Sequence, residues 1–356
     1  MPIFIEGRPA PARWADRQAA QPLSMDITGG PRSGCIRIAL VNNMPDAALE
    51  DTEVQFFTLL DTASGDTPIR VRLYSLPGID RAERGRQHVS SFYSEFCDLW
   101  TRQFDAVIVT GTEPCTPKLH NEPYWPQLTQ LIEWAERNTL SSVWSCLAAH
   151  ASVLHGDGIE RRRLSDKRFG VFEGTRIADH VLTKSGEKVR FPHSRWNDIP
   201  ADALHESGYT VLTASPAAGV DSFIKVRKRS LFLHFQGHPE YEANTLFKEY
   251  RRDIRRFLRG ERESYPPMPQ GYFDSSAAEI LSDFQSIALS SRDEDLMTSF
   301  PEEAIVRGLE KGWHTCAVSV YRNWLHLIEQ RRREAPAFRP LSVIADQLYK
   351  GRSAAQ

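Results

Sequence analysis

Val143-Trp144-Ser145-Cys146-Leu147-Ala148-Ala149-His150 is the stretch from which the fold is best predicted. The apolar pair Val143 and Trp144 is typical of the end of a buried strand, and the small residues after Cys146 favour a helix start. Cys146 then lies at a sharp strand-to-helix turn, where the following backbone amides converge at the positive end of the helix dipole. A thiol placed there tends toward the thiolate and can act as a nucleophile. The alternative is a small buried hydrophobe, which is the commoner role of a free cysteine.

The chain before this turn alternates between strand and helix patterns. Residues 36–41 and 105–111 are apolar runs typical of strands, and residues 49–60 and 126–135 carry apolar side chains at helical spacing. This alternation predicts a parallel sheet covered by helices on both faces. Sites in such sheets form at the carboxyl ends of strands. Thr110-Gly111 lies at the end of one strand and the cysteine turn follows another, which supports a site at this edge.

The remaining segments suggest how the chain is organised. Residues 81–88 are polar and predict a loop, and residues 161–235 contain short strand-like pieces separated by glycine turns. We expect an N-terminal arm over residues 1–34, because this stretch is rich in Ala, Pro, Gly and Arg. The main domain is expected over residues 35–274, followed by a helical C-terminal extension with a polar tail over residues 275–356.

Composition excludes several classes of function. The chain has 356 residues, with 44 basic and 46 acidic side chains, so its charge gives no case for binding nucleic acid or a membrane surface. No apolar run has the length of a signal peptide or a membrane span. The five cysteines show no C-x-x-C pairing, which argues against a metal site and favours free thiols in a reducing compartment. We therefore expect a cytoplasmic protein.

A second motif supplies partners for a nucleophile. His238 follows the apolar run 231–235, and Pro239 disfavours a helical conformation for it. In an extended stretch His238 and Glu240 point to the same side, so the carboxylate can orient the imidazole. Cysteine, histidine and glutamate would then act as nucleophile, base and orienting group. The spacing permits Cys146 to meet His238 but does not require it.

Several strings carry a resemblance to a known family, in its order and approximate spacing. They are Met44-Pro45, Thr110-Gly111, Tyr124-Trp125, Cys146, Lys167 with Gly170-Val171-Phe172, Pro192-His193-Ser194-Arg195, and Gly237-His238-Pro239-Glu240-Tyr241. The chain resembles the homoserine O-acyltransferase (homoserine transsuccinylase) family over about residues 36–253. The resemblance implies an α/β, class I glutamine amidotransferase-like (flavodoxin-like) fold with a mostly parallel sheet, and a place in methionine biosynthesis.

The same resemblance implies a ping-pong acyl transfer. Cys146 would attack the thioester of acyl-CoA, release coenzyme A and keep the acyl group as a thioester. His238, held by Glu240, would take the proton from the acceptor hydroxyl. The backbone amides of Leu147 and Thr112 would form the oxyanion hole. Acyl-CoA is then a co-substrate, and no bound cofactor is expected.

The resemblance also implies residues that select the substrates. Lys167, Ser194 and Arg252 would line the amino-acid acceptor pocket, although composition alone would make Lys167 a solvated lysine and Arg252 part of a charged helical face. The fork of Arg252 suits an α-carboxylate. Cys115 occupies the position that governs acyl choice in the family, where glycine goes with succinyl and glutamate with acetyl. A small uncharged residue there favours succinyl-CoA over acetyl-CoA.

The chain departs from the family pattern in the regions that select substrates. Asp46-Ala47-Ala48 stands where the family has lysines, Leu147 replaces a tryptophan, and Trp196 follows Pro-His-Ser-Arg. The acceptor is therefore homoserine or a related hydroxy- or amino-acid. The arginines at 161–163 are expected in a solvated loop, with contact to CoA phosphates as the alternative.

Three classes of function remain open at this stage. A CoA-dependent O-acyltransferase, with small-molecule substrates and a homodimeric assembly, explains all the motifs. A glutamine amidotransferase or amide hydrolase could use the same Cys146, His238 and Glu240, but would leave Pro-His-Ser-Arg and Arg252 unexplained. A non-catalytic binding protein would not need the three residues.

Overall fold

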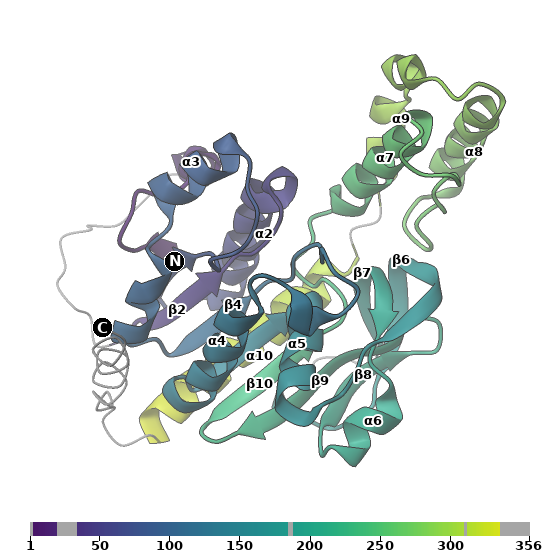
Figure 1. The fold of residues 1–356 in the computed structure, drawn as a ribbon. Coiled ribbons are helices and arrows are strands. Elements are labelled where there is room, and N and C mark those ends of the chain that lie inside the picture. Colours follow the sequence, from purple (N-terminus) through teal and green to yellow (C-terminus); the bar gives the residue numbers. More distant parts are fainter. Residues whose placement is uncertain (1–2, 20–33, 184–187, 310–311, 335–356) are drawn as a thin grey trace, which may run out of the picture.

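A single mixed sheet organises the protein (Figure 1). The computed structural model describes residues 3–19, 34–183, 188–309 and 312–334. Within these ranges ten strands pair in the order β1-β3-β2-β4-β5-β10-β9-β8-β6-β7. In that order their bounds are Ile3–Ile5, Ile69–Tyr74, Ile36–Val41, Ala106–Val109, Ser141–Ser145, Ser230–Phe235, Gly219–Arg227, Thr210–Ser215, Arg162–Arg176 and Lys188–Asp198.

The first six strands in this order, from β1 to β10, pair in parallel. Among them β4, β5 and β10 are buried along their whole length. Alternate side chains of β2 point to opposite faces, so Ile38 and Leu40 pack with α2 (Asp46–Ser64) and α10 (His314–Glu334). Ala39 and Val41 pack instead with α4 (Trp125–Asn138) and α5 (Leu147–Asp157). The predicted parallel sheet with helices on both faces is confirmed.

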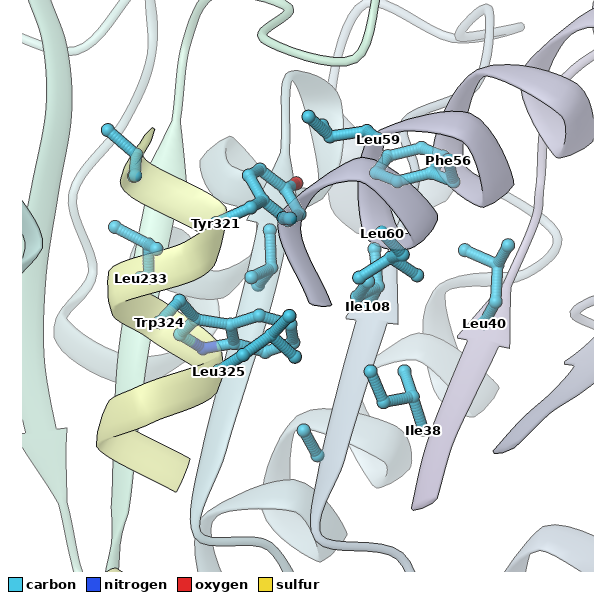
Figure 2. Packing of buried hydrophobic residues seen from close by; sticks show 14 of the residues in the cluster. Ile38, Leu40, Phe56, Leu59, Leu60, Ile108, Leu233, Tyr321, Trp324 and Leu325 are labelled. Carbon is cyan, nitrogen blue, oxygen red and sulfur yellow. The ribbon is translucent and has the colours of Figure 1, made fainter. Parts of the chain in front are cut away.

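The C-terminal helix α10 is part of the main core. Figure 2 shows Tyr321, Trp324 and Leu325 beside Leu60 of α2, over the strands of the sheet. The indole nitrogen of Trp324 donates to Ser141 Oγ on β5 at 2.9 Å. The last described helix therefore closes one face of the sheet.

The remaining strands, β9, β8, β6 and β7, form an antiparallel extension of the sheet, with α6 (Ala201–Glu206) beside β8. The short elements are α1 (Ala12–Ala19), α3 (Glu83–Phe92), η1 (Phe96–Thr101), η2 (Leu119–Asn121) and η3 (Val181–Thr183). No helix in the described part of the chain is long and apolar enough to cross a membrane.

A separate apolar cluster lies above the carboxyl edge of the sheet (Figure 1). It is built from α7 (Thr245–Leu258), α8 (Ser275–Ser290), η4 (Glu294–Ser299) and α9 (Glu302–Val306). Side chains on both sides of residue 274 thus share one core, and the chain then returns to the sheet as α10.

Two segments differ from the sequence-based expectation. The predicted loop over 81–88 is wrong over most of its length, because α3 begins at Glu83. This helix buries only Gly85 among its residues, so it has no apolar stripe that would reveal it. In the N-terminal arm, β1 pairs with β3 and extends the sheet by one strand. Three residues are too few to show a strand period.

Candidate active site

The backbone at Cys146 is the most unusual in the site. β5 ends at Ser145, α5 begins at Leu147, and Cys146 between them has φ 52° and ψ −115°. Only Lys228 shares a positive φ with it among the described non-glycine residues. Such a conformation costs about 1–3 kcal/mol. The amide of Cys146 donates to the carbonyl of Phe235 at 2.8 Å, which ties the turn to the end of β10. The predicted strand-to-helix turn is confirmed.

His238 follows the end of β10 by three residues. Its amide donates to the carbonyl of Pro192 on β7 at 2.7 Å. Gly237 is required before it, because a Cβ there would lie 2.6 Å from Asp221 Oδ1 and 2.9 Å from His193 Cε1. The imidazole of His238 stacks on the ring of Tyr241, with centroids 4.2 Å apart. These contacts fix the ring beside the turn.

Cys146, His238 and Glu240 form one connected line. Nδ1 of His238 is 2.8 Å from Glu240 Oε1, which also accepts from the hydroxyl of Ser145 at 3.4 Å. Burial alone lowers the pKa of His238, but the charges of Glu240 and Cys146, and hydrogen bonds to both, raise it well above its usual value. The imidazole therefore holds a proton between a carboxylate and a sulfur.

The two predicted oxyanion donors come from segments that meet at this turn. The Leu147 amide lies at the N-terminus of α5. A Cβ on Gly111 would lie 3.1 Å from that amide nitrogen and 3.4 Å from Cys146 Cβ. A side chain at 111 would therefore crowd the amide. Thr112, the other predicted donor, is half-buried and directly follows Gly111.

Lys167 and Ser194 converge on a carboxylate of α7. Nζ of Lys167 is 3.6 Å from Glu249 Oε2 and 3.4 Å from Asp253 Oδ2. The hydroxyl of Ser194 donates to Glu249 Oε2, and the hydroxyl of Tyr241 donates to Glu249 Oε1 at 2.7 Å. Since Tyr241 stacks on His238, this cluster is continuous with the Cys–His–Glu line.

Arg252 joins the cluster from the same helix. Its Nη2 is 3.1 Å from Asp253 Oδ1, and 46% of its side chain is exposed. Burial lowers its pKa, but the charges of Asp253 and Glu249 more than offset this and raise it. Glu249 and Asp253 were not among the predicted site residues. Their i, i+4 spacing places both on one face of a helix, which is the signal that could have found them.

Cys115 lies in the loop that follows Gly111, and its side chain is exposed. Its amide donates to Glu122 Oε2 at 3.2 Å, and the amide of Thr116 donates to Glu122 Oε1 at 2.7 Å. Glu122 is only 2% exposed, so a buried carboxylate anchors this loop. No sequence pattern singles out Glu122. The influence of Cys115 on acyl choice stays a prediction.

Three other buried histidines lie close to polar side chains. His150 Nε2 lies 3.1 Å from Gln236 Oε1, His234 Nε2 lies 3.1 Å from Ser152 Oγ, and His193 Nε2 lies 3.3 Å from Asp221 Oδ1. Burial lowers the pKa of all three, to about 3 for His150 and His234. In the described ranges, no group of three or more His, Cys, Asp or Glu side chains could hold a metal ion.

A family model described as homoserine O-succinyltransferase matches residues 20–333. The chain belongs to this family. Relatives named homoserine O-succinyltransferase include one from Rhodopseudomonas palustris, 47% identical over 82% of this chain and 87% of the relative. Another, from Methylorubrum extorquens, is 40% identical over 88% of this chain and 94% of the relative. The family predicted from the motifs is confirmed, and the protein is an enzyme of the acyltransferase class.

Among solved structures, the chain is similar to a glutamine amidotransferase from Methylobacillus Flagellatus. The two share 16% sequence identity with a TM-score of 0.45, over 83% of this chain and 95% of the other. Within the described ranges, the strand order and the helix α10 agree with the predicted α/β architecture of a mostly parallel sheet with a helical C-terminal part.

Proposed function

We propose that the protein transfers a succinyl group from succinyl-CoA to the hydroxyl of homoserine, through a thioester on Cys146. The observation that carries this proposal is the line from Cys146 through His238 to Glu240, at a positive-φ turn. Membership of the homoserine O-succinyltransferase family supports the reaction and its place in methionine biosynthesis.

In the first half-reaction the sulfur of Cys146 attacks the carbonyl carbon of the thioester. The new S–C bond forms as the bond to the CoA sulfur breaks, and His238 gives its proton to the departing CoA thiolate. The amides of Leu147 and Thr112 stabilise the intermediate oxyanion. Coenzyme A leaves as a thiol and Cys146 carries the succinyl group.

The second half-reaction uses His238 as a base. Part of the rise in the pKa of His238 comes from the charge of Cys146 and its hydrogen bond. An acylated sulfur is neutral, so this contribution disappears and the imidazole is free to accept a proton. His238 then takes the proton of the homoserine hydroxyl, whose oxygen attacks the thioester and releases Cys146.

The cluster around α7 provides complementary charges for a small zwitterion. Arg252 presents a half-exposed guanidinium for the α-carboxylate, and the carboxylates of Glu249 and Asp253 suit an ammonium group. Lys167 on β6 and Ser194 on β7 both contact the carboxylate of Glu249. The acceptor pocket is thereby proposed next to His238.

Mass spectrometry of the intact protein tests the proposal. The protein is mixed separately with succinyl-CoA, acetyl-CoA and glutamine, and CoA release is then assayed with homoserine and related amino acids. We expect a succinyl adduct that homoserine discharges and that is lost in Cys146→Ala. An adduct that persists in this variant, or ammonia released from glutamine in place of acyl transfer, would contradict the proposal.

Some expectations stay predictions. Cys115→Glu should disfavour succinyl-CoA through crowding and repulsion of its carboxylate, so an unchanged donor preference would show that Cys115 does not govern acyl choice. A homodimer, a cytoplasmic location and the absence of a bound cofactor also await measurement.

A further inference from the structure

Arg161 contacts the loop that carries Cys115, although it was expected in a solvated loop. It directly precedes β6 and is half-buried, whereas Arg162 and Arg163 are exposed. Its Nη2 donates to the carbonyl of Pro117 at 3.2 Å, in the loop that carries Cys115. Its guanidinium also interacts electrostatically with Cys146. Arg161 therefore contacts the loop that carries Cys115 and is close enough to Cys146 for their charges to interact.

This guanidinium lacks a close counter-ion. In the part of the chain that the structure describes, no carboxylate lies within 4.0 Å of it, whereas Arg162 pairs with Asp198 at 3.2 Å. Tyr124 and Glu122 are close enough to act on its charge, but both oxygens of Glu122 accept from the loop amides. Burial lowers the pKa of Arg161, and the nearby charges of Tyr124 and Glu122 do not offset this effect. A half-buried cation of this kind is costly unless an anion binds it.

We propose that Arg161 binds the distal carboxylate of the succinyl group while that group is carried to and held on Cys146. The inference rests on the proposed function and names the residue that recognises the donor. A succinyl chain places its second carboxylate roughly 4 Å from the thioester carbon, given ordinary C–C bond lengths. The planar fork of arginine matches a carboxylate in two hydrogen bonds. An acetyl group offers no such anion.

CoA phosphates carry the same anionic chemistry, but the pantetheine arm separates them from the reacting sulfur. The two sources are distinguished by three donors: succinyl-CoA, acetyl-CoA and succinyl-pantetheine, which has no phosphate. The rate of acylation of Cys146 by each donor is followed by intact mass without an acceptor, in wild type, Arg161→Gln and Arg161→Lys. Arg163→Gln is the matched control. Arg163 is two residues from Arg161, and its guanidinium carbon lies 4.5 Å from the centre of the Trp196 ring.

We expect Arg161→Gln to slow acylation by both succinyl donors about 10- to 100-fold, as for the loss of a charged hydrogen-bonded pair. Acylation by acetyl-CoA should change less than about two-fold, because the lost pair has no counterpart in that donor. Arg161→Lys should fall between, because it keeps the charge without the fork. Arg163→Gln should match wild type with all three donors.

Other outcomes overturn the inference. Loss confined to the two CoA thioesters, with succinyl-pantetheine unaffected, assigns Arg161 to the phosphates. If Arg161→Gln slows acylation equally with all three donors, Arg161 acts only by supporting the loop through its contact with Pro117. If Cys146 is acylated in wild type and Arg161→Gln still prefers succinyl-CoA to acetyl-CoA as wild type does, this inference alone is overturned. A wild type that forms no adduct with any thioester overturns the proposed function and this inference with it.

Discussion

At the scale of single residues, the strained backbone of Cys146 lowers the stability of the protein and exposes the proposed nucleophile at the turn. Its φ of 52° with ψ of −115° suits glycine better than any residue with a Cβ. We predict that Cys146→Gly and Cys146→Ala both lose acyl transfer. The glycine variant should nevertheless have a free energy of unfolding in urea about 0.5–1 kcal/mol higher than that of Cys146→Ala, because the relief of backbone strain exceeds the entropic cost of glycine.

Ala149→Gly is the control for this comparison, because Ala149 is buried inside the same helix α5. There glycine should destabilise the protein by about 1 kcal/mol. If Cys146→Gly is no more stable than Cys146→Ala, the turn holds no strain and its geometry has another cause.

The sequence predicted the residues that lie close together along the chain or at strand ends. His238 and Glu240 are two apart, and Cys146 follows an apolar run, so local rules were sufficient. Glu249 and Asp253 escaped because arginines surround them in α7, which is typical of a solvated face. Their contacts with Lys167 depend on long-range packing that the chain spacing does not encode.

At the scale of elements, the loop between β4 and α4 is predicted to depend on one buried side chain. Glu122→Ala removes the acceptor for the amides of Cys115 and Thr116 and for the Thr116 hydroxyl. The loop should then open, and tryptic cleavage after the exposed Lys118 should accelerate at least several-fold. The exposed Glu113 lies in the same loop, and Glu113→Ala should leave the cleavage rate unchanged. Equal rates in both variants would mean that Glu122 does not order the loop.

Helix α10 is expected to stabilise the whole sheet through Trp324. This side chain is fully buried, and its nitrogen donates to Ser141 at 2.9 Å. We predict that Trp324→Ala lowers the free energy of unfolding by about 3–5 kcal/mol, measured by urea denaturation. Trp324→Phe should cost less, because it keeps most of the apolar contact. A loss below about 1 kcal/mol for the alanine variant would show that α10 is dispensable for the core.

The strands of the parallel sheet were predictable because burial on both faces gives continuous apolar runs. The packing of α10 was not, because an apolar stripe shows that a helix has a buried face without naming its partner. Trp324 belongs to such a stripe, yet only the structure brings it to β5.

At the scale of the whole molecule, buried neutral histidines make stability depend on pH. Burial, with the charge of Arg227 next, lowers the pKa of His234 to about 3. The unfolded chain, with an ordinary histidine pKa near 6.5, binds more protons as the pH falls below that value. Stability is therefore lost on acidification between about pH 6.5 and pH 3. For His234 alone the loss by pH 5 amounts to about 2 kcal/mol.

His234→Phe should remove this contribution, because phenylalanine cannot take up a proton and keeps the ring that stacks on Phe223 at 4.6 Å. Urea unfolding near pH 7.5 and near pH 5 measures the change in stability for each protein. The variant should lose about 2 kcal/mol less than wild type between the two conditions, whatever its absolute stability. His326→Asn, an exposed site on α10, should behave as wild type. An equal pH-dependent loss in His234→Phe and wild type would mean that folding does not lower the pKa of His234.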